Sequence, residues 1–273
     1  MASHDHSMSI PLPSRYGTFW IGERIFSSKK RAVLENLGYH GPWLRCYAKP
    51  LLCKETWSSM SSFSADNPSP RWRELVALYR RMHTEGDGAL AAEEMFVGMP
   101  RLEQISNLKA LVDAQEAKSL LDYGSGKGMQ WRMDFNLGDF FETDEKRLRD
   151  FLGLETVNCF DPGYEPFSKP PPTTYDGVIC LDVLEHCPED DVPWVLDQIF
   201  GYASRFVLAN IASYPVTKVL SNGETAHCTV KQAAWWREHV AVASAAHPAV
   251  RYRIHCREPS PDGSEILEIV LEG

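Results

Sequence analysis

The sequence predicts an α/β fold built on a mostly parallel sheet, and three observations carry that prediction. Short apolar runs, each of strand length, alternate with segments of helical pattern over the second half of the chain. One run leads into glycines at alternate positions, 124, 126 and 128, as expected where a strand turns sharply into a helix beneath a ligand. The last two runs flank the turn-rich link 258–263, which would bring the final strand back antiparallel to its neighbour.

Composition limits the classes of protein and partner. The 273 residues are 44% hydrophobic, enough for one substantial core, and they carry a formal net charge of −9. Binding to a nucleic-acid backbone needs a basic face, so this charge argues against nucleic acid. We expect a small-molecule or sugar-like substrate, and a monomer or homodimer.

Targeting signals and cysteine usage indicate the compartment. No apolar run is long enough to span a bilayer, and residues 1–9 lack the apolar core of a signal peptide, so we expect a cytoplasmic protein without membrane contact. The seven cysteines are scattered without a Cys-x-x-Cys pair, which predicts reduced thiols.

Residues 1–100 are expected to form a helical cap on a catalytic domain at 101–273. The tryptophans at 20, 43 and 57 lie among Gly, Pro and Ser, up to a breaker at 64–70. Apolar residues then recur every three or four positions, which predicts a helix over 71–86. A second helix is expected at 101–117. Its predicted buried face consists of Leu102, Ile105, Leu108, Leu111 and Val112.

Downstream, the pattern predicts six strands and two unusual connections. The strands are expected at 119–123, 156–160, 177–181, 206–211, 252–256 and 266–271. Too few residues separate Asp161 from Asp176 for a helix and a strand, so a Pro-rich link is expected there. The stretch 129–153 is long and aromatic. We expect it to be a helix packed on the sheet, or alternatively a wall of aromatic rings beside a bound cation; its rings are Trp131, Phe135, Phe140 and Phe141.

The glycine loop is the first motif that carries chemistry. Residues 119–128 read Ser-Leu-Leu-Asp-Tyr-Gly-Ser-Gly-Lys-Gly, an apolar strand that ends in an acid before the glycines. The spacing matches neither the phosphate cradle ending in Gly-Lys-Ser/Thr nor the dinucleotide fingerprint. The candidate cofactor-binding residues here are Asp122, Tyr123, Gly124, Ser125, Gly126, Lys127 and Gly128.

Two further acidic residues end predicted strands. Asp161 precedes Pro162 and Gly163, and a carboxylate at this place can accept hydrogen bonds from both hydroxyls of a ribose; the alternative is a turn aspartate. The run Tyr-Asp-Gly-Val-Ile-Cys-Leu-Asp-Val-Leu-Glu-His at 175–186 reaches the carboxyl end of the sheet with three more cofactor candidates, Leu181, Asp182 and Val183.

Together these motifs resemble the class I S-adenosylmethionine (SAM)-dependent methyltransferases of small molecules. In that family an acid precedes Gly-x-Gly-x-Gly, and a Leu-Glu-His turn follows the fourth strand. The resemblance extends over about 71–271 and includes Phe96-Val-Gly98. It implies a Rossmann-like fold, SAM as cofactor, and Asp182 near the methionine part of SAM. The acid that touches adenine in this family belongs to the third unit, which is missing here.

The acceptor side is less defined by pattern. His227 follows an Asn-Gly turn beyond a strand end, where a neutral imidazole could take a proton from the acceptor; a surface or capping role is the alternative. His186 is a second catalytic candidate; its alternative role is to satisfy backbone groups where the strand turns into a helix. Further candidates are Tyr79, His83 and Tyr214. Histidines and acids show no ligand spacing, so no metal is expected.

The sequence therefore favours a SAM-dependent methyltransferase acting on a small molecule. A methyltransferase-like cyclase, which would form azetidine-2-carboxylate and methylthioadenosine from SAM, is the first alternative. A SAM-binding regulator without turnover is the second, because a fold does not guarantee an activity.

Overall fold

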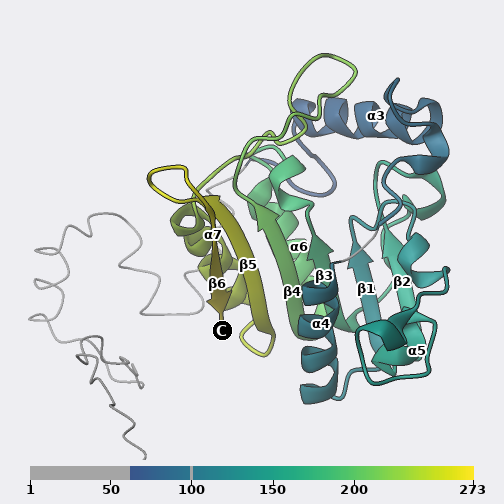
Figure 1. The fold of residues 1–273 in the computed structure, drawn as a ribbon. Coiled ribbons are helices and arrows are strands. Elements are labelled where there is room, and N and C mark those ends of the chain that lie inside the picture. The colour runs from purple at the N-terminus through teal and green to yellow at the C-terminus, as the bar shows by residue number, and fades with distance from the viewer. Residues whose placement is uncertain (1–61, 99–100) are drawn as a thin grey trace, which may run out of the picture. The chain divides into compact units, whose positions relative to one another are not determined.

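The centre of the molecule is a six-stranded sheet of order β2-β1-β3-β4-β5-β6 (Figure 1). It is seen in a computed structural model that describes residues 62–98 and 101–273. The strands are β1 (Ser119–Tyr123), β2 (Thr156–Phe160), β3 (Tyr175–Leu181), β4 (Ala203–Ala212), β5 (Arg251–Pro259) and β6 (Ile266–Glu272). β1 to β5 pair in parallel, and β6 is antiparallel to β5. The predicted mostly parallel sheet with its C-terminal antiparallel pair is confirmed.

The strand predictions are accurate in position and too short in length. The bounds of β1 and β2 agree with the sequence pattern, whereas β3 to β6 extend beyond it. β4 begins at Ala203 and includes the exposed Ser204 and Arg205, which the apolar pattern excluded. Backbone pairing with β3 continues there to Tyr175, so hydrogen bonding rather than side-chain character sets the end of the strand.

Helices cover both faces of the sheet, as expected (Figure 1). On one face, α4 (Leu102–Ala114) and α5 (Leu148–Leu152) pack over Leu120 and Phe206. On the other, α6 (Val192–Tyr202) and α7 (Ala233–Ala246) form the larger core, which includes the fully buried Trp236. The central strands are therefore packed between two apolar helical layers, and the polar residues of these strands lie at the strand ends.

Helix α3 (Pro70–Glu85) lies at the carboxyl ends of the strands (Figure 1). Ser69 caps it by accepting from the Trp72 N–H at 3.0 Å, and Gly86 ends it. The Ser69 backbone N–H also donates to the Asp191 carboxylate at 3.0 Å, at the start of α6. The Ser69 cap thus ties α3 to the domain that carries the sheet, and the predicted helix at 71–86 is confirmed.

Two expectations about helices are wrong. The stretch 129–153 is not one helix: it contains the 3-10 turns η3 (Met129–Trp131) and η4 (Leu137–Asp139) before the short α5. Asn136 and Gly138 favour turns, and the chain folds back so that Asp134 pairs with Arg147. Helix α4 is shorter than predicted, and Leu102 at its start is 42% exposed rather than buried.

The aromatic residues of this stretch pack as core. Trp131, Phe135 and Phe141 lie partly buried against the α4 and α5 face, and Phe140 is 61% exposed. The stretch therefore packs on the sheet as expected, although it is not a helix, and the alternative of a ring wall beside a bound cation stays a prediction. The predicted shortening of the third unit is confirmed, since only η5 (Glu165–Phe167) stands between β2 and β3.

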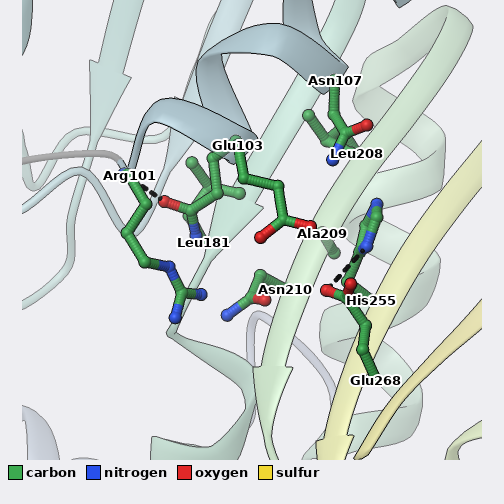
Figure 2. A pocket seen from close by; sticks show the side chains of 10 residues that line it. Arg101, Glu103, Asn107, Leu181, Leu208, Ala209, Asn210, His255 and Glu268 are labelled. Atoms are coloured by element: carbon green, nitrogen blue, oxygen red, sulfur yellow. Dashed lines mark hydrogen bonds and ion pairs between the residues drawn. The ribbon is translucent and has the colours of Figure 1, made fainter.

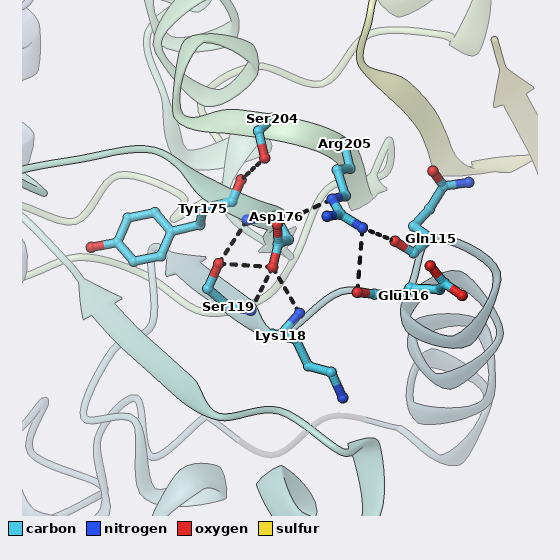
Figure 3. Close-up of polar contacts among 8 residues, drawn as sticks. All are labelled: Gln115, Glu116, Lys118, Ser119, Tyr175, Asp176, Ser204 and Arg205. Carbon is cyan, nitrogen blue, oxygen red and sulfur yellow. Dashed lines mark hydrogen bonds and ion pairs between the residues drawn. The ribbon is translucent and has the colours of Figure 1, made fainter.

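The amino ends of the strands are held by the Asp176 carboxylate (Figure 3). Its Oδ2 accepts the backbone N–H groups of Lys118 at 2.7 Å and Ser119 at 3.0 Å, and its Oδ1 lies 3.2 Å from the Arg205 guanidinium. Although burial opposes it, this set of hydrogen bonds lowers the pKa of Asp176. Because Asp176 lies at the opposite end of the sheet from the glycine loop, we assign it a structural role.

Several sequence expectations concern residues outside the described ranges. Cys159, Cys180, Cys187, Cys228 and Cys256 are free thiols, as predicted, and Cys46 and Cys53 lie outside. The tryptophans at 20, 43 and 57 also lie outside the described ranges. The helical cap at 1–100 therefore stays a prediction, and the helices described within it are α3 and η2 (Ala92–Glu94). None of the described helices combines the length and apolar character that crossing a membrane requires.

Candidate active site

The site lies where the strand order reverses. Chain connections run from β1 outward to β2 on one side and from β3 to β5 on the other, so the carboxyl ends of β1 and β3 flank a topological switch point. Asp122 lies near the end of β1, and Asp161 and Asp182 directly follow β2 and β3. The three predicted carboxylates therefore meet at one edge of the sheet, which is where open α/β sheets bind ligands.

The glycine loop makes hydrogen bonds within the protein through every backbone N–H from residue 124 to 129. The Gly124 and Ser125 N–H groups donate to the Phe160 carbonyl, and Gly128 donates to the Ser125 carbonyl. The Gly126 N–H donates to the Asp161 Oδ2 at 2.8 Å. The Lys127 and Met129 N–H groups donate to the carbonyls of Phe96 and Val97 at 2.8 and 3.0 Å. The loop therefore has no free backbone N–H groups between residues 124 and 129 that could bind a phosphate.

A segment of the chain itself lies against this loop. Gly126 has φ +56, and a Cβ there would be 2.2 Å from the Phe96 carbonyl oxygen. Phe96 also has positive φ, 49°, which is uncommon for an aromatic residue. The glycine at 126 is thus required by the close approach of the segment Met95–Gly98, a neighbour that sequence spacing did not reveal.

Side chains of several predicted loop residues point away from a ligand. The Tyr123 hydroxyl donates to Gln198 at 2.6 Å inside the α6 layer, and Val183 packs against Gly124. Lys127 donates its ammonium to the Ala92 carbonyl and lies over the Tyr164 ring. The Pro162 carbonyl accepts from Arg80, and Leu181 faces α4. These residues shape the loop mainly through backbone and packing.

Asp122 is a buried carboxylate with two side-chain donors. Gln130 Nε2 and Trp131 Nε1 both donate to its Oδ2, at 2.6 and 2.7 Å. Desolvation by burial outweighs these hydrogen bonds and, with the nearby Asp161 charge, raises the pKa of Asp122 to about 7. Sequence analysis placed Asp122 at the loop but gave no sign of Gln130, which follows the glycines and is 6% exposed.

We expect Asp122→Asn to remove part of the pH dependence of stability. The folded state holds a proton on Asp122 up to about pH 7, whereas in the unfolded chain the carboxyl releases its proton near the ordinary aspartate pKa of 3.8. Stability therefore falls as pH rises through this window, by about 1 kcal/mol between about pH 6 and about pH 8. Urea unfolding at both values should show this loss in the wild type and a smaller one in the variant. The exposed Glu155→Gln is the control, and equal losses in wild type and Asp122→Asn would contradict the assignment.

Asp161 and Asp182 differ in what surrounds them. Asp161 accepts from the Gly126 and Gly163 N–H groups, each at 2.8 Å, and desolvation nevertheless raises its pKa. Asp182 is exposed, adopts φ 55, accepts from the Asn210 amide and lies 3.9 Å from the Arg101 guanidinium. Asp161 thus secures the loop while keeping lone pairs, and Asp182 presents a carboxylate at the open edge.

Four of the five predicted acceptor-side residues come together beside this edge. The Tyr79 hydroxyl lies 2.7 Å from His186 Nδ1, and the rings of His186 and His227 are 4.9 Å apart. Tyr214 lies next to His227, with ring centroids 6.1 Å apart, and its own hydroxyl accepts from Arg257. The turn η6 (Leu184–His186), helix α3 and the β4–α7 connection each supply part of this cluster.

Backbone carbonyls define the tautomers of both histidines. His186 Nδ1 lies 2.8 Å from the Ala226 carbonyl, and His227 Nδ1 lies 2.7 Å from the Tyr214 carbonyl. A carbonyl oxygen can only accept, so each Nδ1 carries a hydrogen, and in the neutral form of each ring Nε2 is the nitrogen with the lone pair. Desolvation, with the nearby His227, lowers the pKa of His186 to about 4, so its imidazole is neutral near pH 7.

His83 is separate from this cluster. It is 6% exposed, its ring packs between Phe96 and Tyr164 at 4.8 and 4.9 Å, and its Nδ1 has no hydrogen-bond partner in the described residues. Desolvation, with the charges of Lys127 and Lys218, lowers its pKa to about 4. The structure thus places His83 behind the segment that covers the glycine loop.

Glu185 is the site residue that sequence reasoning named only as part of a turn. Its side chain is fully buried, and its Oε1 accepts from the Ala212 N–H at 3.0 Å. Desolvation, reinforced by the Asp182 charge, raises the pKa of Glu185 to about 8. The signal that could have identified it is its place directly before His186, three residues beyond a strand-end acid.

Two cavities lie near the site. One, between α4 and the ends of β3 to β5, has a volume of about 10 Å³, the space of a single water molecule (Figure 2). Figure 2 shows Arg101 and Asn210 at this cavity and the His255–Glu268 pair beside them. The other cavity, of about 470 Å³, lies beside β2 and is lined by Gly128, Trp131 and the Pro-rich link. Its size falls in the range of small-molecule sites, about 300–1,000 Å³.

The fold and the site define an open α/β protein with a Rossmann-like sheet and an acidic ligand edge at its switch point. No family model matches the chain. No curated protein sequence matches it. Among solved structures, the chain is similar to 1,6-didemethyltoxoflavin-N1-methyltransferase of Burkholderia thailandensis, solved with 1,6-didemethyltoxoflavin and S-adenosylhomocysteine. The identity is 15%, the match covers 77% of this chain and 92% of that one, and the TM-score is 0.40.

Proposed function

We propose that the protein is a SAM-dependent methyltransferase that acts on a small-molecule acceptor. The observation that carries the proposal is the meeting of Asp122, Asp161 and Asp182 around a glycine loop whose N–H groups are all used internally. Asp161 and the exposed Asp182 give this edge hydrogen-bond acceptors, and Asp182 gives it an exposed carboxylate, whereas the loop has no free N–H donors. Such an edge suits a ligand that brings its own donors and positive charge, and it does not suit a nucleotide di- or triphosphate.

SAM fits these requirements. It carries an ammonium, a sulfonium and two ribose hydroxyls, and when bound it supplies a methyl group on a good leaving group. Asp161 would accept from the ribose hydroxyls, and the exposed Asp182 would stand at the positively charged methionine end. The Ser125 and Gly128 carbonyls each accept one backbone N–H within the protein, and the second lone pair of each oxygen could accept a further donor.

The chain's own contribution to catalysis is mainly positional. Tyr79, His186, His227 and Tyr214 form a wall on the acceptor side, and α3 covers it. A wall of this kind orients the acceptor and excludes water. In their neutral form the two histidines would each offer an Nε2 lone pair that could take a proton from the acceptor, because Nδ1 carries the hydrogen of the ring.

Incubation with SAM tests the activity directly. We expect the purified protein with SAM alone to form no product, and S-adenosylhomocysteine to appear when a small-molecule extract is added, as measured by mass spectrometry. A protein-free incubation controls for spontaneous decay of SAM. Methylthioadenosine together with azetidine-2-carboxylate from SAM alone would instead establish the cyclase, and tight SAM binding without either product would establish the regulator.

A further inference from the structure

A cluster of three side chains on the acceptor side has its ligand atoms turned toward one another. Glu185, His186 and His227 each offer one such atom, and these atoms all lie within 4.8 Å of one another. Glu185 and His186 are neighbours on η6, whereas His227 comes from the β4–α7 connection. Folding thus creates a grouping that sequence spacing did not indicate.

Backbone contacts hold the two parts of the cluster together. The Cys228 and Thr229 N–H groups both donate to the Glu185 carbonyl at 3.0 Å, and the Thr229 hydroxyl donates to the Cys187 carbonyl at 2.6 Å. His227 directly precedes this clamp. Its position relative to Glu185 and His186 is therefore set by main-chain hydrogen bonds on its C-terminal side.

Each imidazole is oriented in the way that metal-binding histidines are. The Nδ1–H of His186 donates to Ala226 and that of His227 donates to Tyr214, both to backbone carbonyls. In metal sites, such a hydrogen bond from the nitrogen that does not bind the metal fixes the orientation of the ring and leaves Nε2 as the coordinating atom. The Tyr79 hydroxyl donates to the same Ala226 carbonyl at 3.1 Å and lies 2.7 Å from His186 Nδ1, so it also helps to orient the His186 ring.

The carboxylate of the cluster has a free oxygen. Glu185 Oε2 is buried without a hydrogen-bond partner in the described part of the chain, although Oε1 is satisfied by Ala212. A buried polar atom without a partner is costly, and native structures rarely retain one without a reason. The Glu185 Oε2 atom is therefore a buried acceptor that no donor in the described part of the chain uses.

The geometry points to a binding site for a divalent transition-metal ion held by Glu185 Oε2, His186 Nε2 and His227 Nε2. Two imidazoles and one carboxylate are a ligand set of catalytic zinc and of related first-row ions, whereas Mg²⁺ and Ca²⁺ favour all-oxygen sites. Ligands at about 2.0–2.2 Å from such an ion lie within about 4 Å of one another. Small side-chain movements therefore bring the three atoms to coordinating distance.

Three protein ligands leave at least one coordination position open, and this gives the acceptor a chemical class. His186 is partly exposed, so solvent reaches part of the cluster, whereas Glu185 and His227 are buried. With an ion bound, the two Nε2 lone pairs are occupied and no longer act as proton acceptors. An acceptor hydroxyl bound to the ion would instead lose its proton to solvent, because a bound cation stabilises the oxyanion. This assignment of an oxygen acceptor rests on the proposed methyl transfer, whereas the metal site itself does not.

Metal binding can be tested without SAM or an acceptor. We expect chelator-treated full-length protein to take up one Zn²⁺ per chain, measured by competition with a chromophoric chelator and by metal analysis after gel filtration. His227→Asn is the sharpest variant, since its amide can still donate to the Tyr214 carbonyl while the Nε2 lone pair is removed. It should weaken zinc binding by at least about 100-fold, and Glu185→Gln should do the same.

His247→Ala is the matched control, because His247 pairs with Asp197 away from the cluster and His4 and His6 are unchanged in every variant. Circular dichroism checks that each variant is folded. Equal zinc affinity of wild type and His227→Asn would overturn the site.

The open position has its own readout. Co²⁺ bound in place of zinc should give visible absorption bands that shift when acetohydroxamate, a chelating oxygen ligand, is added. An unchanged spectrum would overturn the open coordination. Zinc binding without methyl transfer would support the metal site and contradict the proposed function. Methyl transfer by protein that binds no zinc would support the proposed function and contradict the metal site.

Discussion

Gly126→Ala should abolish measurable SAM binding and destabilise the protein. The new Cβ would lie 2.2 Å from the Phe96 carbonyl oxygen, a backbone atom, so the segment Met95–Gly98 must move and the Lys127–Phe96 hydrogen bond must break. The φ of +56 is strained for any side chain and costs roughly 1–2 kcal/mol by itself. We expect a total loss of about 2–4 kcal/mol in unfolding free energy.

Gly223→Ala is the control that separates the backbone strain of a positive φ from the steric clash expected in Gly126→Ala. Gly223 also has positive φ, +85, but a Cβ there would meet nothing within 4 Å. It should therefore show only the backbone penalty, about 1 kcal/mol, and bind SAM like the wild type. Urea unfolding and titration calorimetry with SAM measure both effects. If the two variants behaved alike, the close approach of Phe96 to the loop would not be the reason for glycine at 126.

Asp161→Ala should weaken SAM binding by about 10- to 100-fold. The carboxylate accepts from the Gly126 and Gly163 N–H groups and is our candidate for the ribose hydroxyls. One hydrogen bond to a charged acceptor is worth about 1.5–3 kcal/mol, and 1.4 kcal/mol corresponds to a tenfold change in affinity, so the net loss of one such bond accounts for this range. A lower melting temperature should accompany the loss, because the Gly126 N–H loses its acceptor.

Glu165→Ala is the control for Asp161→Ala, since it removes an exposed acid from the same link without touching the loop. Its SAM affinity should equal that of the wild type. Calorimetry that found Asp161→Ala folded and unchanged in affinity would place the ribose elsewhere.

The internal use of the loop's N–H groups changes how its chemistry is understood. A glycine-rich loop after a strand is often associated with phosphate binding through free backbone donors. Here Phe160, Asp161, Phe96 and Val97 accept most of those donors. The loop is therefore a close-packed junction between β1, β2 and the segment before α4, and under the proposed function the carboxylates around it would recognise the ligand.

The sequence by itself determined the sheet and the acids at its edge. Apolar runs of strand length, a turn-rich link before β6 and acids at run ends are local patterns, so residues 119–123 and 156–160 could be assigned as strands from them alone. The missing third unit was equally readable, because chain length between Asp161 and Asp176 bounds what can fit.

Only the tertiary structure decided which distant groups meet. The Met95–Gly98 segment against the glycine loop, the turn structure of 129–147 and the grouping of His227 with Glu185 and His186 depend on contacts between segments far apart in the chain. Such contacts follow from shape, burial and unsatisfied hydrogen bonds across the whole fold, which a local pattern does not encode. For that reason the acids at the strand ends were foreseen from sequence, and the grouping of Glu185, His186 and His227 was not.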